Sequence, residues 1–173
     1  MRAQSWAGER DEQRIQYLRA IFDGFPVPAF IVDDDVKIHD FNTAAEALLG
    51  PEPAMALFRR GGEALHCIHS EMNGCGKAEP CQDCVIRTSV KKAISTQAVF
   101  REFHKAELRT SKGVAKINLL VTTNLLPYTE EPRVLVIPED VAGKLTAGHK
   151  RRRPSRHFPD EKADPTGPGP VGS

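Results

Sequence analysis

The N-terminal part of the chain changes from a helical to a strand-like pattern of hydrophobic and polar positions. In residues 10–23, apolar residues recur at helical spacing among charged ones, so we predict an amphipathic N-terminal helix. Two prolines just beyond this segment end the helix. Residues 28–34 form a short β-rich run, and residues 36–41 alternate apolar and polar side chains after an aspartate-rich turn. Together the two segments predict a β-hairpin.

The rest of the chain predicts two more helices and three strands. Asn42 and Thr43 suit the start of a short helix that ends at Gly50. Residues 51–66 look like short helical turns and loops, and a longer helix with one apolar face is predicted to start near Cys84. The final third alternates in the manner of three antiparallel strands, over residues 99–108, 114–128 and 133–141.

This order of elements resembles the PAS fold. The matching residues are 28–50, PAFIVDDDVKIHDFNTAAEALLG, with the step from Phe41 to Asn42 into the helix, and 134–141, VLVIPEDV. The resemblance covers about residues 14–141. It implies an α+β domain in which helices cover one face of a five-stranded antiparallel sheet. It also implies a sensor or interaction domain, of a kind that often dimerises through an N-terminal helix.

The resemblance and the composition of the chain predict three parts. Residues 1–13 are an extension that includes the start of the helix, residues 14–141 are the PAS-like sensor domain, and residues 142–173 are a tail. The chain as a whole has a net charge of +1, but from Lys144 onward seven Lys and Arg stand against three Asp and Glu. The tail is rich in Pro and Gly and poor in apolar residues, which predicts disorder. Its basic run at 149–153 could bind nucleic acid, but a solvated tail is the simpler interpretation.

The hydropathy of the chain predicts a cytoplasmic protein with no membrane partner. It has no apolar run of about 18 residues, and its first residues lack the apolar stretch of a signal peptide. Disulfides are rare in a reducing compartment, so metal binding or redox chemistry becomes the favoured role for the cysteines.

All the cysteines of the chain lie within eighteen consecutive residues, in the loop 67–84. They are Cys67, Cys75, Cys81 and Cys84, with the spacing C-x7-C-x5-C-x2-C. The two-residue gap of the last pair lets both sulfurs face one metal, and glycines on either side of Cys75 allow sharp bends. We therefore predict that the four thiolates bind a tetrahedral metal ion or an iron–sulfur cluster.

An iron–sulfur cluster is the first choice of cofactor, with zinc as the alternative. Resemblance to oxygen-sensing PAS kinases whose PAS domain holds a cysteine-ligated cluster favours the cluster, although this chain has one CxxC pair rather than two. Small zinc sites usually pair their ligands as two close couples, and Cys67 and Cys75 are too far apart for that. Two further interpretations of the cysteine loop are a thiol–disulfide switch and four unligated cysteines in the core. Covalent haem is excluded because Val85 follows Cys84 where CxxCH needs histidine.

Four histidines are secondary candidates. His66 and His69 flank Cys67 and could replace a cysteine as ligand, but an exposed or outer hydrogen-bonding role is expected. His39 and His104 fall on predicted strands, where a surface or hydrogen-bonded core role is expected and non-covalent haem binding is the alternative.

No catalytic motif is recognisable, so we predict that the protein is not an enzyme. Phosphate-binding glycine loops, nucleophile elbows and zinc-protease motifs are all missing from the sequence. We predict a sensor that reads oxygen or redox state through the cluster. It would signal by self-association through the N-terminal helix and by contact with a separate kinase or regulator, without nucleic-acid binding. A zinc-stabilised interaction module, or a transcription-regulatory partner without a redox cofactor, is the alternative.

Overall fold

The structure is a computed structural model that describes residues 3–127 and 129–142. The basic run at 149–153 and the rest of the predicted tail beyond residue 142 lie outside the described residues.

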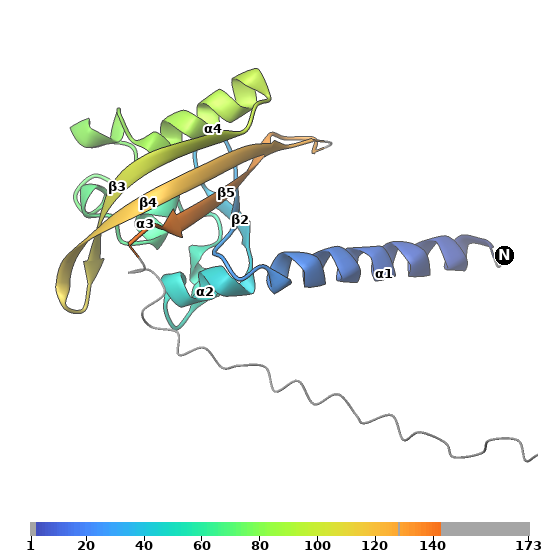
Figure 1. Ribbon diagram of the computed structural model, residues 1–173. Helices are drawn as coiled ribbons and strands as arrows, with labels where there is room; N and C mark the ends of the chain where they lie inside the picture. Colours follow the sequence, from blue (N-terminus) through green and yellow to red (C-terminus); the bar gives the residue numbers. More distant parts are fainter. Residues whose placement is uncertain (1–2, 128, 143–173) are drawn as a thin grey trace, which may run out of the picture.

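Five strands form one antiparallel sheet, in the spatial order β2-β1-β5-β4-β3 (Figure 1). The strands are β1 (Phe30–Val32), β2 (Ile38–Phe41), β3 (Phe100–Thr110), β4 (Gly113–Leu126) and β5 (Arg133–Asp140). The α-helices are α1 (Ala3–Gly24), α2 (Thr43–Leu49), α3 (Gly61–Ala64) and α4 (Val85–Thr96). Three 3-10 helices complete the described chain: η1 (Pro53–Ala56), η2 (Ile68–Ser70) and η3 (Glu79–Cys81). The predicted hairpin, short helix, long helix and three strands are all present.

The hydrophobic core lies between one face of the sheet and the helices. Alternate residues of the central strands point inward, and Val121 of β4 and Val134 of β5 are fully buried. Helix α4 packs on β3, β4 and β5 and buries Val90 and Ala93 completely. The helical and strand periods in the sequence thus identified the faces that meet.

Helix α1 is longer than predicted and projects away from the sheet (Figure 1). It begins at Ala3 rather than near residue 10, because residues 3–9 contain no proline and continue the helix toward the N-terminus. Its C-terminal end is fixed to the domain by Arg19, whose guanidinium pairs with Asp23 and Asp40 at 2.8 Å. No helix in the described part of the chain is long and apolar enough to cross a membrane.

Asn42 joins the hairpin to α2. Its side-chain oxygen accepts from the backbone N–H groups of Ala29 and Ala45, and its amide nitrogen donates to the carbonyls of Val27 and Phe25. The side chain is fully buried. The predicted cap at Asn42 is confirmed, and it also holds the segment that connects α1 to β1.

Candidate functional site

The four cysteines lie on the segment that joins α3 to α4 and includes η2 and η3. The start of this segment is fixed to the edge strand β3, where the Arg109 N–H donates to the His66 carbonyl at 2.8 Å and Cys67 pairs with Leu108. Its end is Cys84, the N-cap residue of α4. The loop is therefore held between the last strand of the sheet and the long helix.

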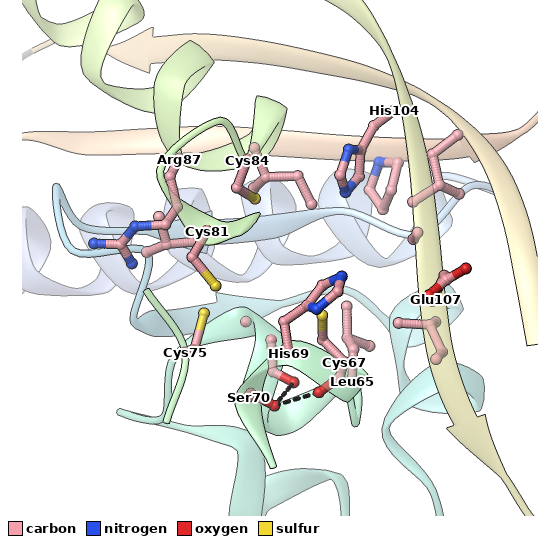
Figure 2. A pocket seen from close by; sticks show the side chains of 18 of the residues that line it. Leu65, Cys67, His69, Ser70, Cys75, Cys81, Cys84, Arg87, His104 and Glu107 are labelled. Carbon is pink, nitrogen blue, oxygen red and sulfur yellow. Dashed lines mark hydrogen bonds between the residues drawn. The ribbon is translucent and has the colours of Figure 1, made fainter. Parts of the chain in front are cut away.

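A cavity of about 430 Å³ opens between this loop and the inner face of the sheet (Figure 2). Apolar side chains form much of its wall, including those of Phe30, Val32, Ile38, Leu65, Ile86 and Leu119. Every cysteine of the chain lines it: Cys67, Cys75, Cys81 and Cys84. The residues that the sequence singled out as a site thus face one shared space.

The sulfurs of Cys75 and Cys81 point toward one another across the cavity (Figure 2). A Cβ added at Gly62 would lie 2.8 Å from the Cys75 sulfur and 3.4 Å from the Cys67 Cβ, so a glycine is needed where these cysteines pack. All four cysteines are free thiols. Among the described residues, no three His, Cys, Asp or Glu side chains are arranged as they stand to hold a metal ion. The convergence of all four sulfurs on one centre stays a prediction.

Burial raises the pKa of the Cys67 and Cys75 thiols above the usual value. The negative charge that neighbouring cysteines would carry raises both pKa values further, whereas the positive charge of Arg87 lowers the pKa of Cys75. These two thiols are accordingly protonated at neutral pH in the cofactor-free protein. Because thiolates are the metal ligands, binding at this site must release protons.

The turns around Cys75 depend on two glycines. Gly74 and Gly76 have φ angles of 84° and 89°, in the left-handed region that side chains rarely adopt. The Arg87 guanidinium packs directly over Gly76, where a Cβ would lie 2.8 Å from Cζ of the arginine. The Cys75 N–H donates to the Glu63 carboxylate at 3.2 Å. This part of the loop is therefore held from both α3 and α4.

Comparison with known proteins identifies the fold. Residues 16–82 match the family model described as a PAS domain. The chain contains a PAS domain. The resemblance to the PAS fold that the sequence indicated is confirmed. No curated protein sequence matches the chain.

Solved PAS domains share this architecture. The PAS domain of an HTR-like protein from Haloarcula marismortui is 21% identical with a TM-score of 0.53, over 79% of this chain and 99% of that one. The PAS domain of nitrogen regulation protein NR(II) from Vibrio parahaemolyticus is 15% identical with a TM-score of 0.51, over 71% and 96%. The PAS domain of Bordetella pertussis BvgS is 14% identical with a TM-score of 0.51, over 75% and 87%. At these identities the likeness establishes the fold.

Two histidines of the PAS domain lie in the cavity wall. His69 comes from the cysteine loop and His104 from β3, and Figure 2 shows both in the cavity. The place of His104 was not predicted, although its alternation with the buried Ala106 could have indicated an inward side chain. His39 is hydrogen-bonded to Asp33, with 3.0 Å between Nε2 of the ring and Oδ2 of the carboxylate.

We expect His104 to make the stability of the cofactor-free PAS domain depend on pH. Burial, and then the nearby charge of His69, lower the pKa of His104 below the ordinary histidine value of 6.5. Its stabilising contribution is fully present above pH 6.5 and is lost as the pH falls from there toward the folded-state pKa, because the unfolded chain takes up the proton first. Denaturant titrations at several pH values should show a shallower pH dependence for His104→Asn. An unchanged dependence would contradict the expectation.

Proposed function

We propose that this PAS domain senses oxygen or redox state through an iron–sulfur cluster held by Cys67, Cys75, Cys81 and Cys84. The observation that carries the proposal is that all cysteines of the chain line one cavity of about 430 Å³. A zinc ion holds each sulfur at about 2.3 Å and needs little space. The volume of the whole cavity is large enough for a group bigger than a single ion, and this supports the cluster over zinc.

The residues around the cysteines fit a negatively charged group. A cluster bound by four thiolates would be oxidised or lost on contact with oxygen. That change is the event that a sensor needs. The Arg87 side chain, only 17% exposed, places a positive charge near Cys75. The apolar wall from the sheet limits water in the cavity and so strengthens the attraction of Arg87 for the thiolates.

Zinc is the second candidate because of how Cys81 and Cys84 are placed. They lie at the end of η3 and at the N-cap of α4, so the close pair sits at the start of a helix. The backbone N–H groups at the start of a helix can donate to sulfur that is bound to a metal. In that case the metal braces the loop, and the PAS surface binds a partner without reading redox state.

We further propose that α1 mediates self-association and that the partner downstream is a separate kinase or regulator. In α1, Ile15 and Leu18 are 66% and 55% exposed, and they lie on one side of the helix with Phe22. Because α1 projects from the domain, this stripe is accessible to a second copy (Figure 1). Sensing and binding, rather than catalysis, would then be the whole activity of the domain, in the reducing compartment that the free thiols suit.

We expect the double substitution Ile15→Asp/Leu18→Asp to weaken self-association about 100-fold. Each buried aliphatic side chain contributes about 1.5–3 kcal/mol, and about 1.4 kcal/mol corresponds to a factor of ten. Sedimentation velocity over a concentration series measures the shift. Gln13→Asp/Tyr17→Asp, with the same added charge on the opposite side of α1, is the matched control and should leave association unchanged. Equal effects of the two pairs would refute a specific helix interface.

The sensing proposal is tested by exposing anaerobically purified protein to air. We expect a visible absorption band that bleaches on exposure, together with a change in the association state measured on the same sample. Protein with a stable absorption spectrum and an unchanged association state would argue against oxygen or redox sensing.

A further inference from the structure

The side chain of Arg87 reaches from α4 to the turn of the β1–β2 hairpin. Its Nη2 donates to the Asp35 carboxylate at 3.1 Å, and its Nη1 donates to the Asp35 carbonyl at 3.3 Å. Arg60 pairs with the same carboxylate at 2.6 Å. The two guanidinium groups hold the pKa of Asp35 below its usual range, Arg60 more strongly than Arg87. The hairpin turn is thus bound by two guanidinium groups that come from outside the hairpin.

The same guanidinium touches the cysteine loop. It packs over Gly76, next to Cys75, and leaves no space for a side chain there. Arg87 is therefore in contact with the loop on one side and with the hairpin turn on the other. A movement of the loop around Cys75 has to displace Arg87 or be resisted by it.

The hairpin turn itself is strained. Val36 follows Asp35 and has a φ angle of 63°, which is a rare conformation for a β-branched residue. Its side chain is only 3% exposed and lines the cysteine cavity. Strain of this kind costs about 1–3 kcal/mol and persists only where surrounding contacts enforce it. The contacts around the turn, those of Arg87 and Arg60 with Asp35 among them, therefore hold Val36 in this conformation.

The far end of β2 is fixed to α1. Asp40 receives both hydrogen bonds from Nη1 of Arg19, at 2.8 Å, and the Phe41 carbonyl accepts from Nη2 at 3.0 Å. Strand β2 is an edge strand that pairs with β1, and on its outer side Ile38 exchanges backbone hydrogen bonds with Phe58 and Arg59. A change at its turn can thus reach Asp40 without disturbing the central strands.

We propose that Arg87 is a positioning residue that couples the state of the cysteine cavity to the β1–β2 hairpin and, through Asp40 and Arg19, to the orientation of α1. The inference rests on the proposed function where it takes the cavity to be occupied. A group bound to Cys75 fixes the loop and keeps Arg87 on Asp35. Loss of that group frees the loop, lets the turn at Val36 relax and loosens the hold of β2 on α1.

The test is amide hydrogen exchange, measured by mass spectrometry on peptides from segments 10–24 and 30–41. In wild-type protein, removal of the cluster or metal by chelation should speed exchange in both segments about fivefold or more, as expected for coupled sites. In Arg87→Gln, exchange should be fast in both states, with no response to removal. Arg109→Gln is the matched control, because Arg109 also binds the loop, through Glu71, but connects it to β3. It should respond as the wild type does.

A second pair of variants tests the coupling without any cofactor. In Gly76→Ala the new Cβ would meet Arg87, whereas in Gly74→Ala, with a similar φ angle, it would meet only the Glu63 carboxylate. In cofactor-free protein we expect faster exchange in segments 10–24 and 30–41 for Gly76→Ala and wild-type exchange for Gly74→Ala.

The outcomes separate this inference from the proposed function. If the protein binds no metal or cluster, and Gly76→Ala but not Gly74→Ala speeds exchange in α1, the coupling is supported and the cluster proposal is wrong. A wild-type response of α1 in Arg87→Gln overturns the coupling, as does equal exchange in the two glycine variants. If Gly76→Ala does not fold, Arg87→Gln decides the question.

Discussion

Replacing Cys81 with serine should abolish binding of iron and sulfide by this PAS domain. Cys81 lies opposite Cys75 in the cavity, with the two sulfurs directed at one another (Figure 2). Loss of an outer hydrogen-bonding partner alone costs about 10–100-fold in metal affinity, and loss of a direct ligand should cost more. Iron and sulfide assays on protein purified without air measure the effect, and the cysteine-to-serine variant at Cys84 should behave in the same way.

His69→Gln is the control for this prediction. His69 lines the same cavity and lies two residues from Cys67, but it is only an alternative to the four predicted cysteine ligands. We expect the variant to keep its full content of iron and sulfide. A Cys81→Ser protein with wild-type cluster content would remove Cys81 from the ligand set, and a His69→Gln protein without a cluster would bring His69 into it.

Replacing Asn42 with alanine should lower the free energy of unfolding by about 3 kcal/mol or more. The substitution removes four hydrogen bonds, two of them buried and two part-buried, from the backbone groups that Asn42 contacts. An unsatisfied buried donor or acceptor costs about 1–3 kcal/mol. Domains of this size have a total stability of about 5–15 kcal/mol, so this single change is a large fraction of it. Chemical denaturation followed by circular dichroism measures the loss.

Asn124→Ala is the matched control for Asn42→Ala. Asn124 lies on β4, and its side chain makes no hydrogen bond within the described residues. Its replacement should change stability by no more than about 0.5 kcal/mol. Equal losses for the two variants would show that Asn42 does not have the central position that the structure gives it.

The fold could be predicted from the sequence because local signals agree with the packing. The apolar alternation in β4 is that of a strand with one buried face, and Asn42 is a helix N-cap by residue type as well as in the structure. The start of α1 could not be placed in this way. Helical propensity near Ala3 is not interrupted by proline or a capping signal, so the pattern sets no boundary there.

The candidate site could be predicted only in part. The clustering of the cysteines in one loop predicted a common site, and all of them line one cavity. The glycines beside Cys75 indicated sharp turns, which are present. Arg87, which packs on this loop at Gly76, also pairs with Asp35, which lies far away in the chain. No local period or spacing encodes such a pair, because it depends on how α4 crosses the sheet.

The most direct test of the account is the iron, sulfide and zinc content of wild-type protein purified without air. We predict iron and sulfide in equal amounts, at a fixed ratio to the polypeptide and without zinc. Stoichiometric zinc with no iron would contradict redox sensing and leave a metal-braced PAS module. Protein without iron, sulfide or zinc would contradict the claim that the four cysteines hold an inorganic centre.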